Sequence, residues 1–296
     1  MALTSRLAII AGGLGGLGSA TGKLLRAQGA RLALLYAPFE ENKKLDLLLK
    51  GYGQTEFPGG EIRTYACDIT SPTSVQGAFA SITSDLGGPV GSGSNASTAF
   101  PSILVNSAGY VSLSPMEDTP PEESARHLDI NILGPMLCSQ AFARLYMTAA
   151  AAAAAGGAAA AATSSSSSPP NPGGATIAPP GRIVSVSSQA AHAALWHHGI
   201  YCASKAGLEA LTRSMASEWG PRGITANTVS PTVAWTELGQ KAWGAPGVAE
   251  AFLKQVPTGR FVMPEEVAET IAFLCRDGSG MVNGADIRID GGFTIR

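Results

Sequence analysis

Charged residues are scarce in this chain, and neither sign of charge dominates. Charged side chains make up 14% of the 296 residues, and the formal net charge is −2. A chain with this balance has no strong field that would attract a nucleic acid or an anionic membrane surface. We therefore expect neither as a partner.

Cysteine is also scarce, and its spacing excludes several kinds of site. The four cysteines stand far apart, without a CxxC pair or the spacing of a cysteine metal site. They are expected to be reduced, small apolar residues of an intracellular protein, and no metal is predicted. They are Cys67, Cys138, Cys202 and Cys275.

Long apolar runs are missing apart from an alanine tract near residue 150. Glycines interrupt this tract, and it leads into serine and proline, so no membrane span of about 20 apolar residues is predicted. The N-terminus reaches an apolar run at once, without a basic region followed by a cleavage site. We expect a cytoplasmic protein.

Hydrophobic residues are plentiful, at 45% of the chain, and form short runs between helical segments. Near-continuous apolar strands alternating with helices are typical of βαβ units, in which helices cover both faces of a parallel sheet. The sequence therefore predicts an α/β fold. The expected strands are 7–11, 31–36, 62–67, 102–106, 182–187 and 225–230, and the expected helices 20–26, 40–49, 74–82, 124–146, 200–219 and 264–274.

Two segments interrupt this alternation. Residues 87–101, rich in Gly, Ser and Asn, are expected to form a lengthened loop. Residues 148–180 are of low complexity, and their alanines can extend the preceding helix. Because a strand follows directly, we interpret this segment as an insertion into one catalytic domain that spans residues 1–296.

A glycine-rich run lies between the first strand and the first helix. Gly12, Gly16 and Gly18 have GxxxGxG spacing. Glycines there permit positive φ and let backbone N–H groups approach a pyrophosphate at a helix N-terminus. A glycine run alone is equally compatible with a plain turn, but the strand–turn–helix context favours dinucleotide binding.

The residue at the end of the second strand bears on the choice of dinucleotide. NAD enzymes usually have a carboxylate there for the ribose 2′-hydroxyl, whereas this chain has Tyr36. NADP(H) is therefore favoured, and NAD(H) remains possible. Lys43 and Lys44 suit a 2′-phosphate or an exposed helix face equally well, and Glu40 and Glu41 oppose a phosphate.

Tyr201 and Lys205 stand four residues apart in a predicted helix and so share one face. A phenol with a pKa near 10 is a poor acid or base at neutral pH, and a neighbouring ammonium favours the phenolate. The pair therefore suits general acid–base chemistry. Tyrosine and lysine are nevertheless common at this spacing, so the pair gains weight only from the motifs around it.

Together these motifs resemble the short-chain dehydrogenase/reductase family along nearly the whole chain. The resemblance implies a single Rossmann-like, doubly wound parallel sheet and a hydride transfer between NAD(P) and a carbonyl or alcohol. Thr232 departs from the family pattern, which has glycine there. The matching motifs are Gly12-x-x-x-Gly16-x-Gly18, Cys67-Asp68-Ile69, Asn106-Ser107-Ala108-Gly109, Asn131, Ser187-Ser188, Tyr201-x-x-x-Lys205, Ser230-Pro231 and Asp290-Gly291-Gly292.

The resemblance also implies the site residues. Tyr201 would be the general acid or base, Lys205 would lower its pKa and hold the nicotinamide ribose, and Ser188 would bind the substrate oxygen. Asn131 would hold a water that links Lys205 to solvent. Asn106 and Asn131 could each instead satisfy backbone groups, and Asp290 is expected to be structural. The remaining cofactor residues would be Gly12, Gly16, Leu17, Gly18, Tyr36, Asp68, Ile69, Asn106, Ala108, Gly109, Pro231, Val233 and Thr236.

Finer similarity points to the substrate. The stretches 188–202 and 230–243 resemble the branch of L-xylulose (dicarbonyl) reductase and of D-threitol and arabinitol dehydrogenases. Gln189, His198 and Trp243 would then contact substrate beside Ser188 and Tyr201. Alternatively, His198 satisfies a loop and Trp243 packs at an interface. His192 and His197 are expected to be exposed.

The leading hypothesis is an oxidoreductase that interconverts a ketose or dicarbonyl with its polyol or alcohol. The resemblance also implies a homotetramer built partly from the helices that carry Asn131 and Tyr201. Two alternatives are a 3-oxoacyl thioester reductase of the same family and a cofactor-binding regulator without turnover. The complete set of catalytic residues speaks against the regulator.

Overall fold

The fold is seen in a computed structural model that describes residues 3–40, 45, 52, 61–86, 99–163, 178–243 and 247–295. Glu41, Lys43 and Lys44 lie outside these residues, as do most of the predicted loop at 87–101 and the Ser-Pro-Gly part of the insertion at 148–180. Within the described residues, no helix combines the length and hydropathy that a bilayer-spanning segment requires.

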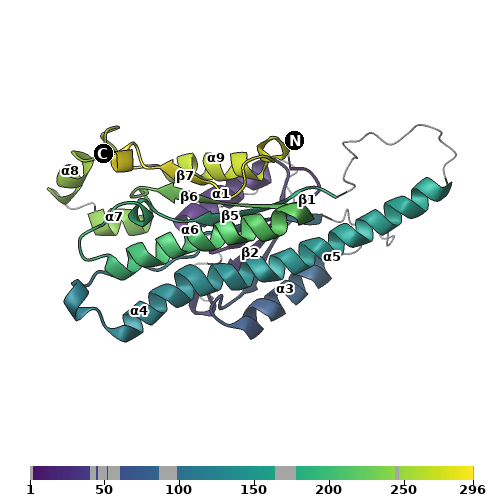
Figure 1. The fold of residues 1–296 in the computed structure, drawn as a ribbon, viewed down its shortest axis with the longest axis horizontal. Helices are drawn as coiled ribbons and strands as arrows, with labels where there is room; N and C mark the ends of the chain where they lie inside the picture. Colours follow the sequence, from purple (N-terminus) through teal and green to yellow (C-terminus); the bar gives the residue numbers. More distant parts are fainter. Residues whose placement is uncertain are drawn as a thin grey trace.

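A seven-stranded parallel sheet in the order β3-β2-β1-β4-β5-β6-β7 forms the centre of the molecule (Figure 1). All six predicted strands are confirmed, and β7, a short half-buried strand, was not predicted. The strands are β1 Arg6–Ala11, β2 Arg31–Tyr36, β3 Ile62–Ala66, β4 Phe100–Asn106, β5 Gly181–Val186, β6 Ile224–Pro231 and β7 Asp286–Ile289.

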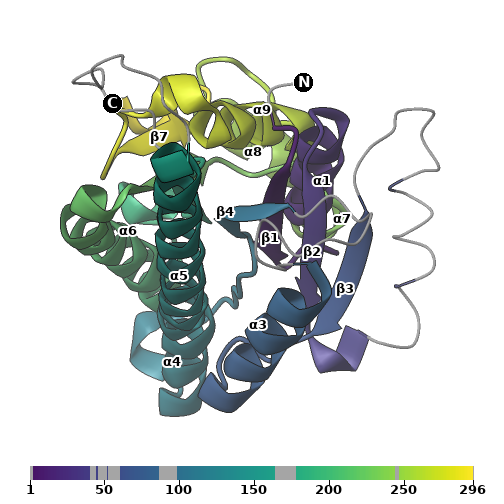
Figure 2. The ribbon, with the colours of Figure 1, turned by 90° about the vertical axis from the view of Figure 1, so that its right-hand side faces the viewer.

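Helices cover both faces of the sheet (Figure 2). Helices α1 and α9 pack together on one face, and α3, α5 and α6 lie on the other. A separate apolar core lies on each side of the sheet, which explains why the strands are apolar on both faces. The helices are α1 Gly16–Ala27, α3 Pro72–Leu86, α4 Pro121–Leu128, α5 Gly134–Thr163, α6 Gly199–Trp219, α7 Glu237–Trp243, α8 Val248–Leu253 and α9 Pro264–Cys275.

The predicted helix 124–146 is interrupted near its middle. A π-helical turn, η3, spans Asp129–Leu133 and joins α4 to α5. Pro135 has no N–H to donate to the Asn131 carbonyl four residues earlier, and the Gly134 amide donates to the Asp129 carbonyl, five residues earlier. Beyond this turn, the alanine tract extends α5 to Thr163, as expected, and the helix projects beyond the sheet (Figure 1).

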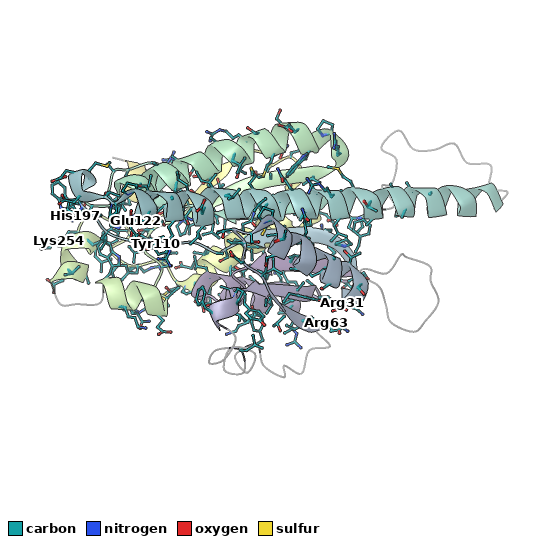
Figure 3. The ribbon with its side chains drawn as sticks, turned by 90° about the horizontal axis from the view of Figure 1, so that it is seen from below. Arg31, Arg63, Tyr110, Glu122, His197 and Lys254 are labelled. Atoms are coloured by element: carbon teal, nitrogen blue, oxygen red, sulfur yellow. The ribbon has the colours of Figure 1, made fainter. Side chains whose placement is uncertain are left out.

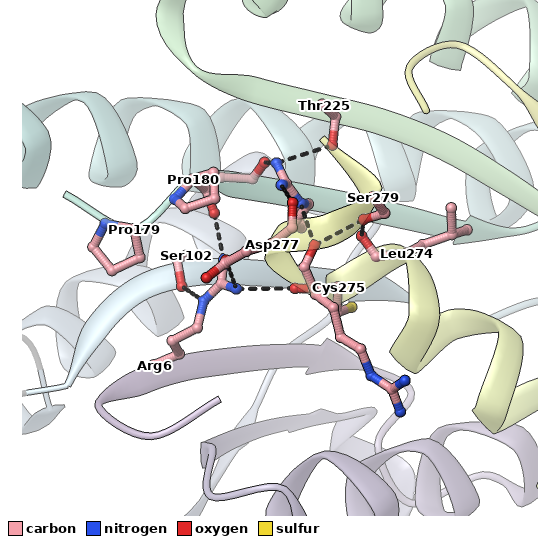
Figure 4. A network of polar contacts seen from close by, with 12 residues as sticks. Arg6, Ser102, Pro179, Pro180, Thr225, Leu274, Cys275, Asp277 and Ser279 are labelled. Carbon is pink, nitrogen blue, oxygen red and sulfur yellow. Dashed lines mark hydrogen bonds and ion pairs between the residues drawn. The ribbon is translucent and has the colours of Figure 1, made fainter. Parts of the chain in front are cut away.

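A buried arginine joins several elements at the amino ends of the strands (Figure 4). The Arg6 guanidinium donates to Ser102 Oγ at 2.8 Å, to the Cys275 carbonyl at 2.9 Å, and to the Pro180 carbonyl. It also forms an ion pair with Asp277 at 3.1 Å. Burial lowers the pKa of Arg6, and Asp277 opposes this effect.

Replacing Arg6 with methionine should destabilise the protein by about 2–4 kcal/mol. The substitution leaves the buried carbonyls without donors, a loss that exceeds the value of one exposed ion pair. Urea unfolding of the variant and of the parent would measure the difference. Arg213→Met removes an exposed guanidinium and serves as the control, with an expected change within about 0.5 kcal/mol. An equal loss in both variants would contradict this account.

Candidate active site

The candidate site lies at the edge where the parallel strands end. Ala11 pairs with Asn106, and Asn106 pairs with Ser185, so the carboxyl ends of β1, β4 and β5 are level. The chain runs outward in both directions from β1 and β4, and open α/β sheets bind ligands at such a point. The predicted motifs begin directly after these strand ends.

The glycine-rich turn after β1 brings two other predicted segments into contact with it. Gly12 has a φ of 77°, and a Cβ there would lie 2.7 Å from the Ala108 amide nitrogen. A Cβ on Gly16 would lie 2.5 Å from Cγ2 of Thr236. Only glycine fits at either position. Residues predicted to bind the cofactor from three separate segments are therefore adjacent.

The N-terminus of α1 has the properties of an anion site. Gly15 caps the helix without a side-chain hydrogen bond, and the first turn contains no acidic residue. The N–H groups of that turn have no helical partners and suit a pyrophosphate. These features fit a dinucleotide, which Gly16 and Gly18 would hold by their backbone. The half-buried side chain of Leu17 packs against the apolar core on the α1 side.

Several residues at the predicted adenosine end already contact other protein groups. Tyr36 is buried at the end of β2, and the Glu40 carboxylate accepts a hydrogen bond from the Ala37 amide at 3.2 Å. Asp68 accepts hydrogen bonds from the amide and hydroxyl of Thr70. Ile69 packs against the backbone at Gly134. A carboxylate therefore does lie just beyond β2, contributed by Glu40 rather than by position 36.

Asn106 combines a structural role with one free acceptor. Its Nδ2 donates to the hydroxyls of Ser139 and Ser185, each at 3.1 Å, which ties β4 to α5 and β5. Its Oδ1 is buried without a partner among the described residues. The structural interpretation of Asn106 thus has direct support, and Oδ1 remains available to a ligand.

The loop after β6 accommodates Thr232, where the family has glycine, in an ordinary backbone conformation. The amide of Thr232 donates to the Ile289 carbonyl at 3.1 Å. Among the described residues other than glycine, only Ser5 and His197 have positive φ, so position 232 does not require glycine. Val233 accepts from the Val262 amide, and Thr236 reaches Gly16. From Pro231 onward, the loop therefore leads back to the glycine-rich turn, where Thr236 lies against Gly16.

Tyr201 and Ser188 lie close together. Ser188 follows β5, and Tyr201 lies in the first turn of α6. Burial raises the pKa of Tyr201, and its neighbour Ser188 partly offsets this. Burial is therefore the largest influence on the pKa of Tyr201, and it acts in the direction opposite to the lowering expected from Lys205.

Lys205 is fully buried one turn along α6. Its Nζ lies 5.8 Å from the centre of the Tyr201 ring and donates to the Val186 carbonyl at 2.9 Å. Burial lowers the pKa of Lys205 to about 8. A Cβ on Gly109 would lie 3.4 Å from Nζ and 3.5 Å from Oδ1 of Asn131. Lys205, Gly109 and Asn131 are therefore neighbours.

The side chain of Asn131 is occupied by protein groups. It donates to the Tyr110 carbonyl and accepts from the Tyr110 amide, at 2.9 and 2.8 Å. It also donates to Ser204 Oγ at 2.9 Å. The amide thereby fixes the 107–114 segment against α6. Because Oδ1 and Nδ2 both have protein partners, the predicted water would be held by a backbone atom of Asn131.

Of the three residues predicted to contact substrate, Gln189 is buried, His198 lies beside Tyr201, and Trp243 packs against α8. Gln189 is 2% exposed, and its Oε1 has no partner among the described residues. The His198 ring lies 6.1 Å from that of Tyr201, and its Nδ1 bonds the Trp196 carbonyl at 2.6 Å, which supports both interpretations of this residue. Trp243 packs against Phe252 of α8, with ring centres 4.7 Å apart and the ring planes tilted by 48°.

A set of polar residues beside Tyr201 was not predicted from the sequence. His127 is buried, with its ring 6.3 Å from that of Tyr201; its Nδ1 bonds the Glu123 carbonyl, and its Nε2 accepts from the Ser112 amide. Hydrogen bonds from Ser112 and Tyr110 hold the pKa of Glu123 below its usual range. The sequence held a signal for His127, because it stands four residues before Asn131 in a predicted helix and so should share its face. Figure 3 shows Tyr110 and His197 at the end of the molecule away from Arg31, the first residue of β2.

Comparison with known proteins agrees with this geometry. Residues 12–175 and 171–294 match a family model described as enoyl-(acyl carrier protein) reductase. D-threitol dehydrogenase of Mycolicibacterium smegmatis is 35% identical, covering 99% of this chain and 95% of its own. The NAD-dependent glycerol dehydrogenase of Listeria innocua is 32% identical, and the match covers 99% of this chain and 96% of that protein. The L-xylulose reductase of Bos taurus is also 32% identical, and the match covers 98% of this chain and 97% of that protein. A short-chain dehydrogenase/reductase structure from Serratia marcescens matches with a TM-score of 0.77 and 26% identity, covering 99% of this chain and 100% of that one.

Proposed function

Because this chain belongs to the short-chain dehydrogenase/reductase family and is an NAD(P)-dependent oxidoreductase, we propose that it interconverts a small ketose or dicarbonyl with the corresponding polyol or alcohol. The observation that carries the proposal is the position of Tyr201 next to both Ser188 and the buried Lys205. The names of the relatives, which act on threitol, glycerol and xylulose, support the substrate class.

Each catalytic residue has a proposed task at the substrate oxygen. The nicotinamide, when bound, supplies or accepts the hydride at the carbon. Tyr201 gives its phenolic proton to the carbonyl oxygen in reduction and takes it back in oxidation. Ser188 donates a hydrogen bond to the same oxygen. Lys205 supplies positive charge near the phenol, and Asn131 would hold a water linking Lys205 to solvent.

We propose that the dinucleotide lies along the glycine-rich turn, with NADP(H) preferred. Tyr36, where an NAD enzyme usually has a carboxylate, supports this preference. Glu40 works against it, because its carboxylate is held at the Ala37 amide, just beyond β2. The dinucleotide would also contact the predicted residues from the other strand ends, among them Asp68, Ala108 and Val233.

The polar groups available for a polyol are few and partly buried. Gln189 offers an unpartnered carbonyl oxygen, and His198 presents its ring beside Tyr201. Sites that hydrogen-bond substrate hydroxyls discriminate strongly against substrates that lack them. We therefore propose Gln189 and His198 as substrate-orienting residues. Trp243 would contact the substrate from α7 while its ring is held in place by Phe252 of α8.

A substrate panel tests the proposal. Pentoses, tetritols, pentitols and diacetyl would be assayed with NADPH/NADP and with NADH/NAD. We expect turnover of at least one ketose–polyol pair or dicarbonyl, with higher kcat/KM for the phosphorylated cofactor. Activity on 3-oxoacyl thioesters alone would favour the 3-oxoacyl reductase. Cofactor binding without any turnover would favour the regulator.

We also propose that the whole chain acts as one catalytic domain in a cytoplasmic homotetramer. Helices α5 and α6 lie side by side on one face of the sheet, where they can pack against a second copy (Figure 2). Light scattering that gave the mass of a monomer would overturn the tetramer.

A further inference from the structure

A second cluster of reactive side chains lies behind the catalytic residues. His192 follows the short turn that begins at Gln189, Glu209 lies one turn beyond Lys205 on α6, and Asp286 begins β7. Nε2 of His192 is 3.1 Å from Oε1 of Glu209 and 2.9 Å from Oδ2 of Asp286. One imidazole nitrogen and two carboxylate oxygens from three distant segments thus converge within 4.8 Å of one another.

The separations in this cluster suit metal coordination. Two metal–ligand bonds of about 2.1 Å that meet at an angle between about 90° and 110° place their ligand atoms roughly 3.0–3.4 Å apart. The His192–Glu209 and His192–Asp286 separations, at 3.1 and 2.9 Å, are close to this interval. Small side-chain movements would admit an ion between the three atoms. A mixed imidazole and carboxylate set suits ions such as Zn²⁺ and Mn²⁺.

Among the described residues, no lysine or arginine forms an ion pair with Glu209 or Asp286. The side chains of Glu209 and Asp286 are 7% and 14% exposed, so the two carboxylates are largely withdrawn from water. His192 lies at the surface, as expected, yet only 21% of its side chain is exposed. Two buried carboxylates facing one histidine favour a cation between them.

Hydroxyl groups fix the two carboxylates in place. Ser230 Oγ donates toward Oε1 of Glu209 at 3.1 Å and Oδ1 of Asp286 at 2.6 Å. Thr228 donates to the same Asp286 oxygen at 2.8 Å, which leaves Oδ2 directed at His192. Ser187 bonds Oε1 of Glu209 at 3.0 Å and adjoins Ser188. Such second-shell bonds orient metal ligands and strengthen binding.

We propose that His192, Glu209 and Asp286 form a binding site for a divalent transition-metal ion of the Zn²⁺ or Mn²⁺ type. The ion binds between Nε2 of His192 and the two carboxylate oxygens, His192 coordinates it through an unprotonated Nε2, and any proton displaced from that nitrogen leaves to solvent. It joins the segment carrying Ser188 and Gln189 to α6 and β7. Its role is to stabilise the back of the catalytic site, and it takes no part in hydride or proton transfer.

Zinc binding to the full chain tests this proposal. Protein treated with EDTA would be dialysed against micromolar Zn²⁺, and bound metal and melting temperature would be measured. We expect about one equivalent of zinc per chain and a higher melting temperature with zinc. His192→Ala and Asp286→Asn should each weaken binding at least about tenfold and abolish the thermal shift. Retained NADPH binding would show that each variant is folded, and His192→Ala decides the matter if Asp286→Asn fails to fold.

The matched control is His197→Asn, which removes an exposed imidazole outside the cluster. Asparagine suits this position because His197 has a φ of 61°. The control should bind zinc like the parent. The proposal is overturned if the parent binds no stoichiometric zinc, if His192→Ala binds as tightly as the parent, or if the control loses binding, since that loss would indicate an adventitious surface site.

Discussion

Replacing Tyr201 with phenylalanine should reduce kcat by about 10²–10⁴, the range that positioned acid–base groups supply. The phenolic oxygen is the atom proposed to exchange a proton with the substrate, beside Ser188. The ring itself should stay in place, because its edge contacts with His127 and His198 do not use the hydroxyl. Steady-state kinetics with the best substrate of the panel would measure the loss.

Cofactor affinity separates a chemical defect from a structural one. Fluorescence titration with NADPH should give nearly the same Kd for the parent and for Tyr201→Phe. The control is Tyr65→Phe, which removes a hydroxyl that donates to Asp85 on the opposite flank of the sheet and should retain full activity. If Tyr201→Phe kept more than about a tenth of the parent kcat, Tyr201 would not be the catalytic acid.

Replacing Lys205 with methionine should abolish turnover without lowering stability at pH 7. The substitution removes the buried ammonium beside Tyr201 and keeps a side chain of similar length. Lowering a lysine pKa from 10.5 to about 8 corresponds to a cost of about 3 kcal/mol in the folded state. The Val186 carbonyl loses its donor, a loss of about 1–3 kcal/mol that offsets this gain.

The pH dependence gives this prediction a definite sign. The folded pKa of Lys205, about 8, lies below the unfolded value of 10.5, so the unfolded chain holds more protons between these pH values. The stability contributed by this group therefore rises with pH across that window and is lowest at and below pH 8. Relative to the parent, Lys205→Met should be most stable at pH 7 and lose that advantage by about pH 10.

Thermal unfolding at both pH values would test this, with Lys254→Met as the control. Lys254 is exposed, so its removal should leave the pH dependence of the parent unchanged. A Lys205→Met protein that melted well below the parent at pH 7, or a melting difference independent of pH, would show that burial of the ammonium does not destabilise the fold.

Much of the fold could be predicted from local sequence. Strands such as Arg31–Tyr36 are short, apolar and bounded by turns, and doubly buried strands need only that pattern. Gly12 and Gly16 marked the glycine-rich turn because the chain needs a positive φ at one and a close approach at the other. The four-residue spacing of Tyr201 and Lys205 fixed their common face on α6.

Other elements had too weak a local signal. Strand β7 has four residues and is only half-buried, so its apolar pattern is faint. The short helices α7 and α8 are joined by a contact between Trp243 and Phe252, which come together only in the folded chain. The π-helical turn at Asp129–Leu133 was hidden inside a long helical pattern. Its one local cause, Pro135, was visible in the sequence.

By itself, the sequence determined the α/β fold, the glycine-rich turn and the tyrosine–lysine pair, because each depends on backbone conformation or helical spacing within a few residues. Only the tertiary structure decided that burial raises the pKa of Tyr201, that the Asn131 side chain bonds Tyr110, and that His192 meets Glu209 and Asp286. These facts depend on the order of strands in the sheet. That order brings residues far apart in the chain within bonding distance and withdraws them from water.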